Sequence, residues 1–347
     1  MLKLPFYVRL ACILFALALI LFFMYLGRSL LVPLFFSFLV AILLHPAVRF
    51  LENRHFPRSL ACLTTLLLFM ILFGGLFYFF SHQMVRLSRD LPSLQAKVTD
   101  KWNDMQDWIS VRYHVSNIQQ KDYMNKSASG ILNTAMNSVA TTFFGFFETL
   151  ILTIFFFIFT FFILQYRRHL MRFAVELFDP THNDKVQAVI SRIRSLINSY
   201  VLGLLIEMSV VASVIFMSLM IIGVKYALLI SIMAAVLNII PYLGIYFCMA
   251  LAIIITAATS STGQVIAVGI VFLITHFADA NFILPHVVGG KMKMNPFITI
   301  LVVLTGHLVW GIPGMFLFIP LAAMIRLISE EVPGMEPWAM LLGEEKA

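Results

Sequence analysis

The sequence predicts an all-α polytopic membrane protein with about eight membrane segments. Of its 347 residues, 61% are hydrophobic and only 12% are charged, against roughly 25% charged residues in a typical soluble domain. The apolar stretches are long and unbroken, whereas a transmembrane β-barrel would show short segments of alternating hydrophobicity. Composition therefore excludes a water-soluble protein and favours a bundle of helices in the lipid bilayer.

The net charge of +7 is distributed in a way that argues against a nucleic-acid partner. Basic residues cluster beside the ends of apolar runs, at Arg49, Arg54, Arg58, Arg167 and Arg168, which is the pattern of cytoplasmic anchoring. The three cysteines lie in apolar segments without metal or redox spacing. We therefore expect no nucleic acid, no metal and no cofactor.

Residues 1–81 are predicted to hold three membrane spans, because a span needs about 20 predominantly apolar residues. The apolar runs cover 10–27, 29–48 and 60–80. The first run is longer than a signal-peptide core and no small-residue cleavage site follows it, so we expect it to be retained. The basic connector at 49–59 indicates a cytoplasmic location, which also places the N-terminus inside a bacterial cytoplasmic (inner) membrane.

Residues 82–142 are too polar to enter lipid and are predicted to form an extracytoplasmic helical insert. Apolar residues recur there at alternating spacings of three and four, at Leu87, Leu91, Leu94, Val98, Trp102, Met105 and Ile109. This pattern indicates one stripe on a long amphipathic helix. We expect the stripe to pack on a neighbouring helix or on a second copy of the chain, and hence a homo-oligomer. Lying on the membrane surface is the alternative.

The remaining segments follow in order. A fourth span covers 143–166 and returns to the cytoplasm at Arg167 and Arg168. Residues 167–198 are predicted to form a cytoplasmic interfacial helix, residues 199–330 a C-terminal core, and residues 331–347 a cytoplasmic tail. The C-terminus is therefore expected on the same side of the membrane as the N-terminus.

Two segments of this core, 226–259 and 296–328, have an unusual length. Each is too long for one untilted span and too short for two full spans with a turn. Each is also interrupted near its middle, the first by Pro241 and Gly244 and the second by Gly311, Pro313 and Gly314. Broken backbone in a membrane is viable only when it is buried in protein or lines a water-filled cavity. We therefore predict two broken segments, which are either re-entrant or fully spanning.

Polar side chains stand close to these breaks. Glu207 and Asp279 lie within apolar runs, where a carboxylate costs roughly 2.5–3.5 kcal/mol on insertion scales. Three further polar residues accompany them, namely Asn238 at the first break and His276 and Asn281 beside Asp279. These five residues are candidates for a proton or cation relay or for holding a polar solute. The alternative is that Asp279 and His276 merely pair with each other or lie at an interface.

The spacing of the carboxylates indicates an internal repeat. Glu207 precedes Pro241 by the same number of residues that separates Asp279 from Pro313. Transporters built from such repeats place the substrate at the repeat interface, beside broken helices. The sequence contains no HExxH, GxSxG or P-loop motif, so we expect a secondary transporter and no enzyme. The alternative outside transport is an oligomeric membrane scaffold, in which the polar residues only join helices.

Two C-terminal stretches resemble the autoinducer-2 exporter family, also called the PerM-like permeases. They are GVKYALLISIMAAVLNIIPYLG (223–244) and NFILPHVVGGKMKMNPFITILVVLTGHLVWGIPGMFLFIPLAAMI (281–325). The resemblance implies about eight membrane segments with both termini cytoplasmic. It also implies export of a small polar, autoinducer-2-like signal or, in other members, sodium(lithium)/proton antiport. Where relatives often carry Gly-Gln early in the fifth span, this sequence has Gly203-Leu204, with Glu207 one turn later.

Overall fold

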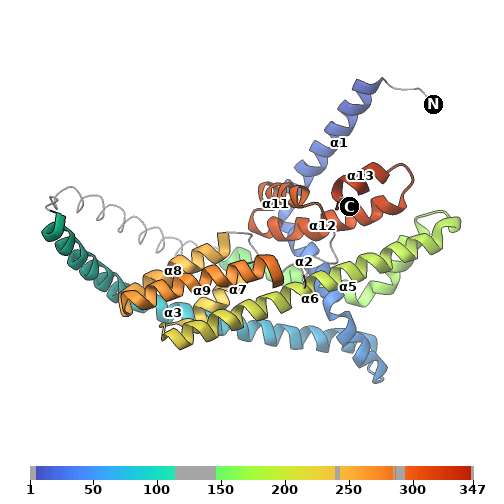
Figure 1. The fold of residues 1–347 in the computed structure, drawn as a ribbon. Helices are drawn as coiled ribbons and strands as arrows, with labels where there is room; N and C mark the ends of the chain where they lie inside the picture. Colours follow the sequence, from blue (N-terminus) through green and yellow to red (C-terminus); the bar gives the residue numbers. More distant parts are fainter. Residues whose placement is uncertain (1–4, 114–145, 239–242, 284–285, 287–293, 345–347) are drawn as a thin grey trace. The chain divides into compact units, whose positions relative to one another are not determined.

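The computed structural model describes residues 5–113, 146–238, 243–283, 286 and 294–344, and these residues are helical without any β-strand (Figure 1). The predicted all-α fold class is confirmed. The α-helices are α1 (Phe6–Leu26), α2 (Arg28–Asn53), α3 (Arg58–Tyr113), α5 (Phe146–Glu176), α6 (Asn183–Ile222), α7 (Ala227–Leu237), α8 (Leu243–Thr259), α9 (Thr262–Ala278), α11 (Pro296–Trp310), α12 (Ile312–Glu331) and α13 (Glu336–Leu342). A short 3-10 helix (Pro180–His182) precedes α6, and a π-helical turn (Asp279–Ile283) follows α9.

Seven helices in the described part of the chain are long and apolar enough to cross a membrane. They lie within α1, α2, α3, α5, α6, α9 with its π-helical turn, and α12. The helices α7, α8 and α11 are apolar but shorter. The short helices fall in the two segments that the sequence predicts to be broken, which become α7–α8 and α11–α12.

The chain divides into two compact units, each of which we describe by itself. Unit 1 comprises Met1–Ile71, Leu152–Glu207 and Phe282–Ala347, and unit 2 comprises Leu72–Ile151 and Met208–Asn281. The helices α3, α5 and α6 therefore contribute residues to both units. Of these, α3 and α6 are longer than the spans expected from apolarity, since α3 continues into the polar insert as far as Tyr113, and α6 joins the interfacial segment to the fifth span without interruption.

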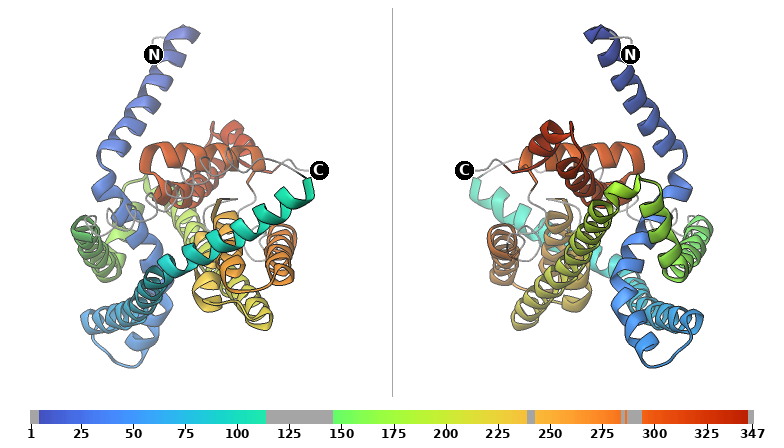
Figure 2. Two further views of the ribbon diagram at one scale, coloured as in Figure 1. Left: turned by 90° about the vertical axis from the view of Figure 1, so that its left-hand side faces the viewer. Right: turned by 90° about the vertical axis from the view of Figure 1, so that its right-hand side faces the viewer.

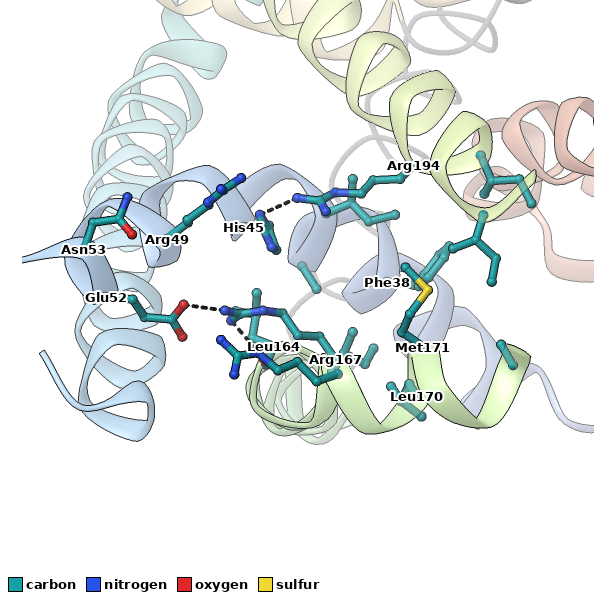
Figure 3. A pocket seen from close by; sticks show the side chains of 17 residues that line it. Phe38, His45, Arg49, Glu52, Asn53, Leu164, Arg167, Leu170, Met171 and Arg194 are labelled. Atoms are coloured by element: carbon teal, nitrogen blue, oxygen red, sulfur yellow. Dashed lines mark hydrogen bonds and ion pairs between the residues drawn. The ribbon is translucent and has the colours of Figure 1, made fainter. Parts of the chain in front are cut away.

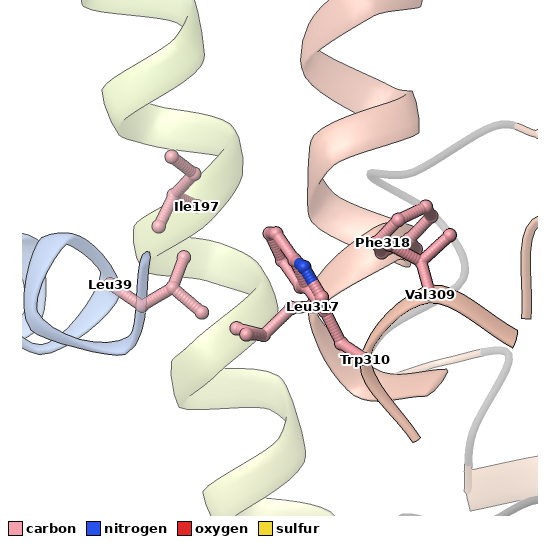
Figure 4. Close-up of a cluster of buried hydrophobic side chains, with 6 residues drawn as sticks. All are labelled: Leu39, Ile197, Val309, Trp310, Leu317 and Phe318. Atoms are coloured by element: carbon pink, nitrogen blue, oxygen red, sulfur yellow. The ribbon is translucent and has the colours of Figure 1, made fainter. Parts of the chain in front are cut away.

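The core of unit 1 surrounds the α11–α12 hairpin. Figures 1 and 2 show α11 and α12 side by side, and the two helices pack against each other along their length. The indole Nε1 of Trp310 donates a 2.8 Å hydrogen bond to the backbone oxygen of Met24, which attaches the hairpin to α1. Figure 4 shows the buried cluster at this junction, formed by Leu39, Ile197, Val309, Trp310, Leu317 and Phe318.

Unit 2 is organised by helices that double back through tight turns. Ser261 and Gln264 form a reciprocal capping box at the start of α9, which satisfies backbone donors that a helix N-terminus otherwise leaves free. The Gln264 Nε2 atom also donates a 2.7 Å hydrogen bond to the backbone oxygen of Ile222 at the end of α6. The α8–α9 turn is thereby joined to α6. Of the apolar stripe predicted on α3, Leu87 is buried, and the side chains of the other stripe residues, from Leu91 to Ile109, lie outside what the structure describes.

Candidate functional site

The clearest polar contact inside unit 2 joins Asn238 to Asp279. Asn238 is the C-terminal cap of α7, where its backbone N–H still bonds to the oxygen of Ala234. Its side-chain Nδ2 donates a 2.8 Å hydrogen bond to Asp279 Oδ2. The Asp279 side chain is only 4% exposed, so the amide at the first helix break holds a buried carboxylate on a different helix.

The backbone at Asp279 departs from ordinary α-helix. The chain widens into the π-helical turn Asp279–Ile283 directly after α9. Such turns are rare and occur frequently at functional sites, because they displace side chains from the regular helical faces. Within the described part of the chain, the second carboxylate oxygen, Oδ1, is buried and has no hydrogen-bond partner. Asp279 therefore retains capacity to accept a proton, a cation or a hydrogen bond from a solute.

His276 lies one turn before Asp279 on the same face and interacts electrostatically with it. Its imidazole packs edge-on against the Tyr246 ring of α8, with the ring centroids 5.3 Å apart and the planes at 64°. The hydrogen bond that holds Asp279 comes from Asn238. An interpretation in which Asp279 and His276 pair only with each other therefore does not account for Asn238, which donates the hydrogen bond to the Asp279 carboxylate.

Asn281 is not brought into this group through a hydrogen bond to Asp279. Its Nδ2 donates a 2.8 Å hydrogen bond to the backbone oxygen of Phe277, four residues earlier, and the side chain is exposed. A side chain that bonds back to its own helix supports the local backbone. Asn281 is therefore the one predicted site residue in unit 2 whose described contact is purely local.

The first break lies between Leu237, the last residue of α7, and Leu243, the first residue of α8. Pro241, which the sequence predicts at this break, lies outside the described residues. At Gly244 a Cβ would stand 1.8 Å from the backbone oxygen of Leu237. No side chain fits at that distance, so glycine at 244 allows α8 to begin directly against the end of α7.

The second break falls at Gly311, which has φ +66° and ends α11. Pro313 lies in the first turn of α12. A backbone N–H at that position would have no acceptor within the helix, so proline costs no hydrogen bond there. Gly314 lies within the same helix and faces Gly306 of α11, and a Cβ on Gly314 would stand 1.9 Å from the Gly306 oxygen. The interruption is therefore a single residue, and the proline and second glycine shape the hairpin after it.

Glu207 belongs to unit 1 and is 4% exposed. It lies two turns after Tyr200 on the same face of α6, because seven residues nearly complete two helical turns. The Tyr200 ring stacks on Phe316 of α12 with centroids 5.7 Å apart. The helix that carries Glu207 thus packs against the hairpin of the second break, whereas Asp279 is bonded at the first.

Three contributors to these sites were not predicted from the sequence. Tyr246, Gly306 and Tyr200 act through contacts between helices that are far apart in the chain. A tyrosine in an apolar helix indicates that its hydroxyl needs a polar neighbour, but it does not indicate which residue on another helix the ring will contact. The glycine at 306 has a clearer signal, since small residues allow close approach of membrane helices.

Comparison with known proteins identifies one family. Residues 14–334 match the family described as AI-2E family transporter. The Bacillus subtilis protein named "Putative transport protein YueF" is 26% identical over 318 residues, covering 84% of this chain and 82% of its own. The Escherichia coli K12 protein named "Putative transport protein YhhT" is 24% identical over 320 residues, covering 91% and 89%. The similarity therefore extends across both units and both broken segments.

Proposed function

Because the chain belongs to the AI-2E transporter family, we propose that it is a proton-coupled secondary transporter that exports a small polar solute, such as an autoinducer-2-like signal. It is a multi-pass membrane protein with bacterial relatives, and membership of the family implies a transported solute. The solute, the direction of movement and the coupling ion are the parts that we propose.

The observation that carries the proposal is the buried carboxylate of Asp279 beside a helix break. Asn238 holds one oxygen at 2.8 Å, and the other has no hydrogen-bond partner in the described part of the chain. A buried carboxylate is costly unless it is paired, protonated or in contact with water. Reversible protonation of Asp279 meets this requirement and gives the chain a proton carrier next to interrupted backbone, as in transporters with discontinuous helices.

The proposed orientation has both termini in the cytoplasm. Asp90 belongs to the insert predicted to be extracytoplasmic, and Lys225 follows α6, which leads away from the interfacial segment predicted to be cytoplasmic. The two meet in unit 2, where Lys225 Nζ donates to Asp90 Oδ2 at 2.6 Å. Glu52 and Arg167, both predicted to be cytoplasmic, meet in unit 1 at 2.5 Å. These contacts support the orientation, because each joins segments assigned to the same side of the membrane. The hairpin form of both broken segments supports re-entrant insertion.

Sodium(lithium)/proton antiport is the second candidate, and the chemistry of the same site favours it. Small monovalent cations are hard and prefer oxygen ligands, such as carboxylates and amide carbonyls. Asp279 offers an unpartnered carboxylate oxygen, and the Asn238 amide beside it contains a carbonyl oxygen. A cation bound there would compete with a proton for Asp279.

A flux measurement in proteoliposomes tests both candidates. The purified full chain is reconstituted with a trapped pH indicator, and candidate solutes are added with and without an imposed proton gradient. Solute flux that requires the gradient supports solute–proton coupling, whereas collapse of the gradient on adding sodium or lithium, but not potassium, supports antiport. If no solute or cation alters either flux, the scaffold alternative replaces transport.

A further inference from the structure

Unit 1 contains a cavity of about 780 Å³ at the end where α2, α5 and α6 carry their basic residues (Figure 3). Its volume lies within the roughly 300–1,000 Å³ of typical small-ligand pockets. All the residues that line the cavity belong to unit 1, whereas Asp279 belongs to unit 2. Neither the transport proposal nor the predicted site residues use it.

The cavity has an excess of positive charge. Four arginines line it, together with one carboxylate, at Arg49, Arg167, Arg168, Arg194 and Glu52. Glu52 is already engaged by Arg167 at 2.5 Å. Arg49 and Arg167 both repel the guanidinium of Arg194, which also donates a hydrogen bond to His45. The cluster therefore favours an anion, and guanidinium groups suit the oxygens of a phosphate.

The rest of the lining is apolar. Figure 3 shows Phe38, Leu170 and Met171 on one side of the cavity, and Arg49, His45 and Arg194 along another. Leu170 is 48% exposed beside the cavity, so its apolar surface continues outwards from the basic cluster. A small hydrophilic anion would make no favourable contact with these apolar walls, whereas the apolar part of an amphiphile would cover them.

We propose that this cavity binds one anionic phospholipid, with the headgroup phosphate at Arg49 and Arg194 and the first acyl carbons against Leu170 and Met171. The proposed orientation places the arginines in the cytoplasmic leaflet, where anionic lipids meet basic pockets between helices. Such a lipid bridges α2, α5 and α6 and neutralises their mutual repulsion. It acts as a structural ligand of unit 1, and its binding does not depend on which solute is transported.

The test is lipid retention by the detergent-purified full chain. Native mass spectrometry measures bound phosphatidylglycerol and phosphatidylcholine after equal additions of each. The double variant Arg49→Gln/Arg194→Gln should retain roughly tenfold less phosphatidylglycerol than the wild type. The matched control Arg54→Gln/Lys185→Gln removes the same charge from the C-cap of α2 and from α6, outside the cavity, and it should retain the wild-type amount.

Thermal unfolding in neutral detergent provides a second measurement. Phosphatidylglycerol should raise the unfolding temperature of the wild type, while phosphatidylcholine and inorganic phosphate should not. If the double variant does not fold, Arg49→Gln alone is used, because Arg49 is exposed, and it should show a smaller loss of the same sign. Equal retention of both lipids, or retention unaffected by these substitutions, would overturn the proposal. Stabilisation by inorganic phosphate equal to that by phosphatidylglycerol would show that the cavity takes a free anion instead.

Discussion

Asn238 and Asp279 are joined by a 2.8 Å hydrogen bond between the end of α7 and the π-helical turn after α9. The bond connects the first helix break to a buried carboxylate that lies 41 residues further along the chain. The end of α7 therefore positions the Asp279 carboxylate, because the donor of this hydrogen bond is Asn238, the C-terminal cap of α7.

Asn238→Leu removes the donor while keeping a side chain of similar size. A hydrogen bond to a charged group contributes about 1.5–3 kcal/mol, so we expect the transport rate to fall roughly ten- to a hundredfold. Solute flux in proteoliposomes measures the change. Asn281→Leu is the control, because Asn281 bonds to its own helix, and it should transport at nearly the wild-type rate. Equal losses in the two variants would argue against a specific role for Asn238.

Glu207→Gln keeps the shape of a buried side chain in α6 and removes its proton exchange. If Glu207 carries a proton, the variant should lose gradient-driven transport while still binding solute, whereas Glu207→Asp should retain part of the activity. Solute binding and gradient-driven flux are measured on the same preparation. Unchanged gradient dependence in Glu207→Gln would remove Glu207 from the coupling mechanism.

Gly314→Ala should destabilise the hairpin of the second break. The added Cβ would stand 1.9 Å from the backbone oxygen of Gly306, so the two helices must separate, and overpacking of this kind costs about 1–3 kcal/mol or more. Gly74→Ala is the matched control, since nothing lies within 4 Å of a Cβ there, and alanine favours an exposed helix by roughly 0.5–1 kcal/mol. Thermal unfolding should show a lower midpoint for the first and an equal or higher midpoint for the second.

The Lys225–Asp90 contact predicts a loss of stability at alkaline pH. The hydrogen bond to the Asp90 carboxylate raises the pKa of the Lys225 ammonium above its ordinary value of about 10.5. A raised pKa stabilises the fold below the unfolded-state value, and that contribution disappears as the pH rises through the folded-state value. Lys225→Met should therefore be less stable than the wild type at neutral pH, and the difference should shrink above a pH of about 10.5. Urea unfolding at a series of pH values would show a constant difference if the contact contributes nothing.

The sequence predicted the fold class and the two interrupted segments because these depend on local signals. Long apolar runs specify membrane helices, and the residues around Gly244 and Gly311 specify the breaks. The sequence predicted a span at 60–80 and a separate amphipathic helix in the insert, but it did not predict that the two form one uninterrupted helix, α3, as far as Tyr113. Apolarity ends at the membrane surface, whereas a helix continues as long as its backbone bonds are not interrupted.

The partners of the candidate residues could not be predicted in the same way. The spacing between carboxylates and prolines paired Glu207 with the first break and Asp279 with the second. In the structure Asp279 bonds to Asn238 at the first break, and the helix of Glu207 packs through Tyr200 on α12. Such pairings depend on how helices distant in sequence pack together, and a repeat in spacing carries no information on that packing.

The most direct test of the account is proton movement through Asp279→Asn. The variant keeps an oxygen for Asn238 to bond and loses the ability to exchange a proton. Wild-type chain, Asp279→Asn and Asn281→Leu are reconstituted at equal density, and proton flux is recorded as the substrate found in the flux screen is added. We predict substrate-dependent proton flux for the wild type and Asn281→Leu, and none for Asp279→Asn. Undiminished proton flux through Asp279→Asn would contradict the assignment of Asp279 as the coupling residue.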